Sequence, residues 1–394
     1  MANVNLTASE QFAKNWTRAA RRDRTLGREL ARRANAFYKK KNVVGFGIGT
    51  KMNRECVIFF VTRKEARYKL NPKDRLPRWI AVGKRRVITD VIGVGKSRLT
   101  VSIGDASDNQ KSYHAAGTGS WKMGTEIRCF TQCQASPARD PQPVSVGTSG
   151  ALVKSAASPS DPPLMLSCGH VLLKPAVDVA QAKEDRVPPC QGAANLKNFI
   201  GGVKDLAQIA TADAGIVECA DGLSEIILIG KYKLPQEPLE GLNVQKSGRT
   251  TGLTHSKITI KECERKLTLP PPLNKLFGVD EVIYKGLFAV DVVCKDSPAL
   301  PANQTLKPKE AVDKFSWEGD SGSLIVAGGG EAHHWGDKDL DDTYEKADAA
   351  GKKTIDDKWQ NAALGLQVLQ DDKYSYGQRI SLALKALSVE LYTG

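Results

Sequence analysis

A serine in the last third of the chain, Ser321, stands in a sequence that suits a catalytic nucleophile. It belongs to the run Gly319-Asp320-Ser321-Gly322, and the apolar residues 324–327 follow almost at once. Such a run predicts a tight turn that enters a buried strand. A turn of this kind can present the serine Oγ beside backbone N–H groups that stabilise a developing oxyanion. The chemistry it favours is acyl transfer through a covalent serine intermediate.

The same run resembles the nucleophile motif of the chymotrypsin/trypsin-like serine peptidases, and two upstream segments resemble that family's other motifs. His170 follows the apolar stretch 164–168 at a small-residue turn, like the family's histidine. Asp213 precedes the short apolar stretch 214–217, like the family's aspartate. The order His, Asp, Ser belongs to the chymotrypsin-type double barrel, whereas other folds carry the triad in other orders.

The resemblance implies a role for each of these residues. His170 would take the proton of Ser321 during attack, and Asp213 would fix the histidine tautomer and stabilise the imidazolium. The backbone N–H groups of Gly319 and Ser321 would form the oxyanion hole. Taken singly, each side chain also has a structural interpretation, as a turn serine, a strand-end histidine or a capping aspartate. Their joint order favours a triad.

The resemblance also implies that substrate preference depends on the residue six positions before the nucleophile. The resemblance implies that an aspartate there selects Arg or Lys at the bottom of the specificity pocket. In this chain that position holds Phe315. We therefore expect a small or apolar preferred side chain rather than tryptic specificity.

The overall composition fits a turn-rich, mainly β protein. The chain has 394 residues, 41% hydrophobic and 26% charged, with 35 Gly and 19 Pro, enough for two or three domains. No apolar run reaches the roughly 18 residues of a membrane-spanning helix. The first residues lack the charged start and apolar stretch of a secretory signal. We therefore expect no transmembrane segment and a cytoplasmic protein.

The eight cysteines are dispersed, so we expect free thiols rather than disulfides. An alternative groups Cys129, Cys133, Cys168 and His170 as a zinc set, but a single four-residue spacing is weak support for a metal site. His333 and His334 with Asp337 are a second possible metal set, but an exposed insertion is the favoured interpretation of that stretch. We expect neither a metal nor a cofactor.

The N-terminal residues predict a basic helix. Residues 8–40 lack proline and carry apolar side chains every three to four positions, with Gly27 as a point where the helix can split. Between Lys14 and Lys41 the chain has eleven basic and two acidic residues, against a net charge of +13 for the whole. Such a helix can dock on its own domain with a solvated face, or contact nucleic acid, an acidic partner or an anionic membrane.

Strand patterns follow the helix up to about residue 92. The glycines at 45, 47 and 49 have the wrong spacing for a dinucleotide fingerprint and suggest a glycine-bearing strand. This block resembles the N-terminal segment of intracellular bacterial trypsin-like proteins and of the plant narrow-leaf protein. Asn42-Val43-Val44-Gly45 also resembles the new N-terminus of activated trypsins, but it lies 127 residues before His170. We expect no such switch, and hence another partner for Asp320.

Together these patterns predict a mainly β protein with a chymotrypsin-like double six-stranded β-barrel and a C-terminal helix, preceded by a small α+β domain that bears the basic helix. The predicted parts are residues 1–100 for the N-terminal domain, 101–142 for a linker, 143–235 for the first barrel and 236–394 for the second. The second barrel includes a charged insertion at 331–360 and a closing helix over 381–391.

The predicted function is intracellular serine endopeptidase activity on restricted protein or peptide substrates, regulated by the N-terminal block. Two alternatives remain open from the sequence. One is a catalytically silent binding protein on the same fold, which lacks a productive oxyanion hole. The other is a nucleic-acid-associated protein that binds through its basic helix.

Overall fold

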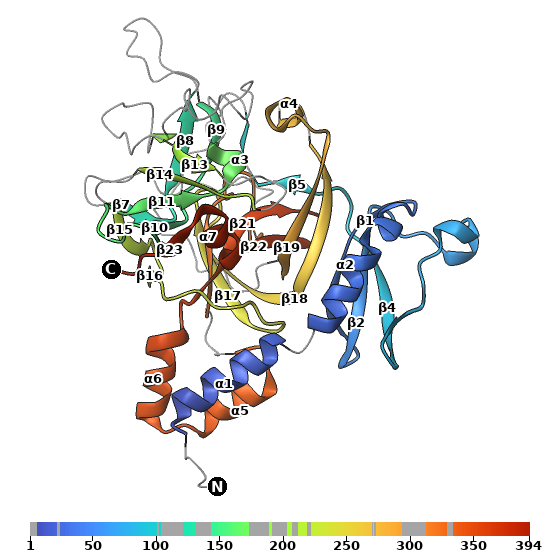
Figure 1. Ribbon diagram of the computed structural model, residues 1–394, viewed down its shortest axis with the longest axis horizontal. Coiled ribbons are helices and arrows are strands. Elements are labelled where there is room, and N and C mark those ends of the chain that lie inside the picture. Colours follow the sequence, from blue (N-terminus) through green and yellow to red (C-terminus); the bar gives the residue numbers. More distant parts are fainter. Residues whose placement is uncertain are drawn as a thin grey trace, which may run out of the picture.

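Over the residues that it describes, the computed structural model of this chain is mostly β, with one large sheet, three smaller sheets and few helices (Figure 1). The residues that it describes are 6–21, 24–100, 102–103, 121–130, 143–172, 189–190, 203–206, 212–218, 222–269, 271, 273–293, 313–328 and 334–394.

Six strands of the large sheet close into a ring. Their order is β17-β20-β21-β22-β19-β18, and β17 also pairs with β18, so both ends of the path meet. The ring carries Ser321 directly before one of its strands. The bounds of the six strands are β17 Asn243–Gly248, β18 Gly252–Thr268, β19 Glu281–Asp291, β20 Leu324–Ala327, β21 Ala363–Gln370 and β22 Tyr374–Arg379.

A five-stranded sheet positions the other two candidate triad residues. Its order is β13-β14-β11-β10-β23. His170 lies in the one-turn helix α3, Gly169–Leu172, just after β11, and Asp213 lies just before β14. The bounds are β10 Ala151–Ser155, β11 Leu164–Ser167, β13 Val203–Leu206, β14 Gly215–Glu218 and β23 Val389–Leu391.

Two smaller sheets are built from strands of the first 231 residues, with the orders β12-β8-β9-β6 and β16-β15-β7. Over the described ranges they are separate from the five-stranded sheet, so the closed first barrel stays a prediction. Their strands are β6 Ser102–Ile103, β7 Trp121–Met123, β8 Glu126–Phe130, β9 Pro143–Thr148, β12 Pro189–Cys190, β15 Gly222–Ile226 and β16 Gly230–Lys231.

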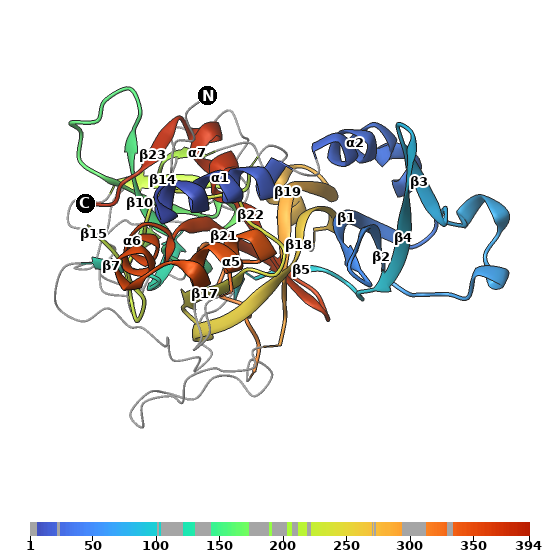
Figure 2. The same ribbon diagram turned by 90° about the horizontal axis from the view of Figure 1, so that it is seen from below.

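The N-terminal strands extend the large sheet beyond the ring. β1 pairs antiparallel with β18, and β2, β4 and β3 follow it outward, as Figures 1 and 2 show from two directions. The strand predicted to carry glycines is β1. A Cβ at Gly47 would lie 2.6 Å from the Cβ of Cys263 on β18, so a glycine permits the close approach. The bounds are β1 Val43–Lys51, β2 Arg54–Val61, β3 Trp79–Val82 and β4 Arg85–Gly93, with short 3-10 turns at Arg67–Lys69 and Pro72–Asp74.

The basic helix is two helices that pack on different surfaces. α1 spans Ala8–Arg21 and α2 spans Arg24–Tyr38, and residues 22 and 23 lie outside the described ranges. The prediction that Gly27 splits the helix is wrong, because Gly27 lies inside α2. Phe12 of α1 packs on Trp335, with ring centroids 5.0 Å apart. Leu30 of α2 belongs instead to the apolar core against β1 and β2.

The insertion at 331–360 contains two helices, α5 Lys338–Lys346 and α6 Ala349–Trp359, capped by Asp337 and Asp348. Both lie beside α1 in Figures 1 and 2. A five-residue helix, α4 Leu273–Phe277, precedes β19.

The predicted closing helix over 381–391 is partly wrong. The helix α7 spans Ile380–Leu387 and ends at Ser388, whose left-handed backbone (φ 54°) stops it. The last residues form β23, which pairs with β10. Of the helices in the described ranges, none combines the length and the apolar character needed to span a membrane.

Candidate active site

Ser321 lies in a turn that only glycines on both sides permit. Gly319 and Gly322 have φ values of 98° and 92°, a region that disfavours side chains. The turn is fixed by a hydrogen bond from the N–H of Gly322 to the carbonyl of Gln367, 2.9 Å long. Ser321 itself has no exposed surface. The sequence run therefore forms the expected turn, and the serine side chain is held inside the protein.

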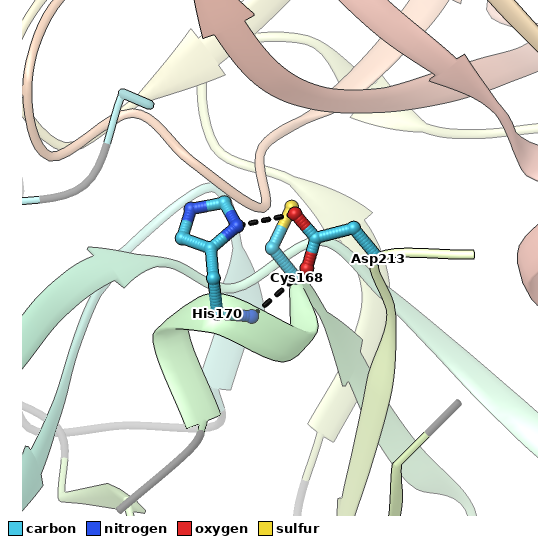
Figure 3. A group of neighbouring side chains, drawn as sticks. All are labelled: Cys168, His170 and Asp213. Carbon is cyan, nitrogen blue, oxygen red and sulfur yellow. Dashed lines mark hydrogen bonds and ion pairs between the residues drawn. The ribbon is translucent and has the colours of Figure 1, made fainter. Parts of the chain in front are cut away.

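His170 connects Ser321 to Asp213. Its Nε2 lies 2.8 Å from the Oγ of Ser321, and its Nδ1 hydrogen-bonds with Oδ2 of Asp213. The backbone N–H of His170 donates to Oδ1 of the same carboxylate at 2.9 Å. Figure 3 shows the ring and the carboxylate facing each other. The structure thus brings together the three residues that the sequence singled out, in the order Asp–His–Ser.

Asp213 is almost fully buried, at 1% exposed, and is held by two residues of the six-stranded ring. The hydroxyl of Tyr284 donates to Oδ2 of Asp213 at 3.1 Å, and the N–H of Asp213 donates to Oε1 of Gln378 at 2.7 Å. Burial, and next the Asp213 carboxylate, raise the pKa of Tyr284 well above its usual value. The phenol therefore stays protonated and remains a donor. Sequence reasoning missed both supports, because each lies on a distant strand.

The carboxylate of Asp320 has a buried lysine as its partner. Nζ of Lys246 lies 3.1 Å from Oδ2, and both side chains have no exposed surface. Asp320 also accepts from the hydroxyl of Thr251 at 2.7 Å and from the N–H groups of Thr250 and Trp317 at 2.8 and 2.9 Å. The prediction of another partner for Asp320 is confirmed, because this network ties the turn before Ser321 to β17 and to the β17–β18 turn.

The segment that resembles the new N-terminus of activated trypsins is part of a strand. Val43 begins β1 and pairs with Val61 on β2. The expectation that no trypsin-like N-terminal switch operates here stays a prediction.

Thr100 lies against the turn that carries Ser321 and contacts it with both its backbone and its side chain. Its carbonyl oxygen accepts from the N–H groups of Gly319 and Ser321, at 2.6 and 3.0 Å. Its Oγ1 lies 2.8 Å from the Oγ of Ser321, and its own N–H donates to the carbonyl of Val368 at 3.1 Å. The two N–H groups expected to form an oxyanion hole thus converge on one oxygen, and that oxygen belongs to the chain itself.

Phe315, the predicted specificity residue, is fully buried. Its N–H donates to the carbonyl of Val292 at 2.7 Å, and its carbonyl accepts from the hydroxyl of Thr254 at 2.8 Å. Nζ of Lys246 lies 5.5 Å from the centre of its ring. Its part in substrate preference stays a prediction.

Cys168 brings a third potential metal ligand near His170 and Asp213, within 4.8 Å (Figure 3). The hydrogen bonds do not suit a metal site. Both ring nitrogens of His170 are engaged, and the thiol of Cys168 donates to the carbonyl of Gln367 at 3.2 Å. Burial raises the pKa of Cys168 well above its usual value, so the thiol stays protonated, whereas zinc binds the thiolate.

The alternative zinc set also requires Cys133, which lies outside the described residues. Cys56, Cys168 and Cys263 are free and buried, as predicted. The side chains of the other five cysteines lie outside the described part of the chain.

Comparison with known proteins gives little beyond this geometry. No family model matches the chain, and no curated protein does. Among solved structures it is similar to a chymotrypsin of Cellulomonas bogoriensis, with 13% identity over 69% of this chain and 98% of that one, and a TM-score of 0.36. It is also similar to a glutamic acid-specific serine protease (14%, 68% and 99%, TM-score 0.37) and to Thermobifida fusca protease A (13%, 70% and 100%, TM-score 0.36). Likenesses this slight carry no argument, so the functional case rests on the site.

Proposed function

We propose that this chain is a serine endopeptidase that cleaves peptide bonds through His170, Asp213 and Ser321. The observation that supports it most is the unbroken set of contacts from Asp213 through His170 to Ser321, beside two N–H groups that converge on one carbonyl oxygen. A hydrogen-bonded base next to a serine, together with such a pair of donors, is what acyl transfer requires.

In the proposed reaction Ser321 attacks the substrate carbonyl carbon while His170 accepts its proton at Nε2. Asp213 holds the other ring nitrogen and stabilises the imidazolium. The N–H groups of Gly319 and Ser321 stabilise the oxyanion, each contribution being worth about 3 kcal/mol. The imidazolium then protonates the leaving amine, and water hydrolyses the acyl-enzyme with His170 again as the base.

The fold that we propose for this chemistry is a chymotrypsin-like double barrel, with residues 143–235 as the first barrel and 236–394 as the second. The closed ring of six strands supports the second barrel. An intracellular setting, with restricted substrates, is part of the proposal, and the free, buried thiols at Cys56, Cys168 and Cys263 support it. Control by the N-terminal block, residues 1–100, is supported by Thr100, which covers Ser321.

The convergence of two N–H groups on the carbonyl of Thr100 favours the peptidase over a catalytically silent binding protein, because it supplies the oxyanion donors that a silent site would lack. No observation on the described residues supports nucleic-acid binding. In α1 and α2, Arg18 pairs with Asp339, and Arg32 and Arg33 pair with Glu29. A salt titration of DNA and RNA binding would decide this alternative, since phosphate-driven binding weakens steeply with ionic strength.

The test of the proposed function is labelling with a fluorophosphonate, which reacts with activated serines. Thr100 covers Ser321, so the experiment uses Leu99→Asp beside the unchanged chain. Leu99 is 6% exposed in the apolar core, and a carboxylate there favours release of the segment. We expect labelling of the Leu99→Asp chain that disappears when Ser321→Ala is added. No labelling of a folded Leu99→Asp chain would refute the proposal.

A further inference from the structure

The segment that carries Thr100 is paired on both sides like a bound peptide. β5, Arg98–Leu99, runs antiparallel to the end of β21, with Leu99 opposite Leu369 and Arg98 opposite Gln370. β6 runs antiparallel to β9 in the other half of the protein, with Ser102 opposite Val146. Between these two short strands Thr100 contacts Ser321. The chain therefore passes from the six-stranded ring to the sheet that contains β9, and Thr100 lies against Ser321 between them.

The contacts of this segment are those that a reacting substrate needs. The N–H of Thr100 is held by Val368, and its carbonyl oxygen is held by both oxyanion donors. The guanidinium of Arg98 lies 4.2 Å from the centre of the Trp317 ring and so fixes the chain just before Thr100. The two oxyanion donors thus hold the carbonyl oxygen of Thr100, and the Oγ of Ser321, which contacts His170, lies beside the hydroxyl of the same residue.

The residues at this contact are closed off from solvent. Ser321 and Thr100 have no exposed surface, and His170 is 1% exposed. An external peptide therefore cannot reach the serine while Thr100 is in place. The carbonyl group that lies at the two oxyanion donors is that of Thr100, in the same chain.

We propose that Ser321 cuts its own chain after Thr100, so that residues 1–100 become a separate polypeptide; this inference rests on the proposed peptidase function. The Oγ of Ser321 bonds to the carbonyl carbon of Thr100 and its proton passes to Nε2 of His170. The bond from Thr100 to the nitrogen of Val101 then breaks, and His170 protonates that nitrogen. Water hydrolyses the ester and leaves a carboxylate on Thr100 and an α-amino group on Val101.

Cleavage would not by itself separate the two pieces. β1 remains paired with β18 along the ring, and Phe12 of α1 remains packed on Trp335. The new carboxylate of Thr100 would still face the N–H groups of Gly319 and Ser321. The cut protein is then a two-chain complex blocked by its own product, and it opens to other substrates when residues 98–100 leave the site.

The test is the fate of the purified full chain during incubation in neutral buffer. We expect fragments 1–100 and 101–394 under denaturing conditions, with the larger one beginning at Val101 by N-terminal sequencing. The rate should be first order and independent of protein concentration, because the reaction is intramolecular. The two fragments should elute together under native conditions.

One variant, used alone and in a mixture, makes the test specific. Ser321→Ala should slow cleavage by about 10⁶-fold, as loss of a catalytic serine does in comparable enzymes, and its melting curve checks that it folds. A tagged Ser321→Ala chain mixed with the unchanged protein should stay intact. Fragments from the Ser321→Ala chain alone, or a new N-terminus other than Val101, would overturn the inference.

The outcome also separates this inference from the proposed function. An unchanged chain that stays intact, while the Leu99→Asp chain labels at Ser321, overturns self-cleavage and leaves the peptidase standing with residues 98–100 as an inhibitor. A folded protein that neither cuts itself nor labels refutes both.

Discussion

The buried ion pair between Lys246 and Asp320 holds the turn of the proposed active site, and a single substitution can test its role. Asp320 lies between Gly319 and Ser321, whose N–H groups form the proposed oxyanion hole. Nζ of Lys246 lies 3.1 Å from its carboxylate. Lys246→Met keeps most of the side-chain volume and removes the charge, so it leaves the Asp320 carboxylate buried without its cation.

The expected cost follows from the contacts that remain. Removing one partner of a buried ion pair typically costs about 3 to 5 kcal/mol, because the other charge is left uncompensated. Asp320 still accepts from the hydroxyl of Thr251 and from three N–H groups, those of Thr250, Thr251 and Trp317. We therefore expect the lower end, about 3 kcal/mol in free energy of unfolding. If the substitution instead distorts the turn around Ser321 without lowering the free energy of unfolding, labelling of Ser321 should slow by more than about 100-fold.

The assay is urea unfolding in the Ser321→Ala background, where the chain stays intact, together with fluorophosphonate labelling in the Leu99→Asp background. The matched control is Lys266→Met. Lys266 pairs with Glu281 at 3.0 Å, but the two side chains are 27% and 51% exposed, so the loss should stay below about 1 kcal/mol. A Lys246→Met chain with the stability and the labelling rate of its parent would refute the role given to this pair.

Three further predictions concern the site itself. Asp213→Asn should lower the rates of labelling and self-cleavage by about 10⁴-fold, because the histidine loses its tautomer control; a fall below tenfold in a folded variant would exclude the proposed role of Asp213. Profiling of the Leu99→Asp chain with a peptide library should show small side chains such as Thr at the residue whose carbonyl is attacked, and a strict preference for Arg or Lys would contradict it. Cys168 should resist alkylation at pH 8 in the folded protein, because burial raises its pKa and the reactive thiolate forms only above that raised value; modification as fast as in urea would show that the thiol is not buried.

The sequence was sufficient to select the residues that meet at the site. His170, Asp213 and Ser321 each stand beside an apolar strand, and strand ends at the junction of two sheets bring such side chains together. The unusual feature of Asp320 was also visible, as an acid beside the nucleophile without an N-terminus to pair with. Its partner Lys246 could not be recognised from the sequence, because a lysine within a strand is ordinarily expected to face water.

Thr100 could not have been found in the same way. Three of its five hydrogen bonds join backbone N–H and C=O groups, which every residue except proline carries, and its partner Ser321 is 221 residues away. The helices show the same limit on a smaller scale. Gly27 suggested a break by its propensity, but it lies inside α2, whose Leu26 and Leu30 pack in the apolar core. The end of α7 depends on the left-handed backbone of Ser388, which its residue type does not predict.

The central claim is that Ser321 hydrolyses peptide bonds, and the most direct test is a peptide with the sequence of residues 97–103, Ser-Arg-Leu-Thr-Val-Ser-Ile, incubated with the Leu99→Asp chain. Mass spectrometry should show a single cut between Thr and Val, and the cut should be absent when Ser321→Ala is added. A peptide that remains whole in the presence of the folded Leu99→Asp chain, or that is cut equally by the Ser321→Ala chain, would contradict the account.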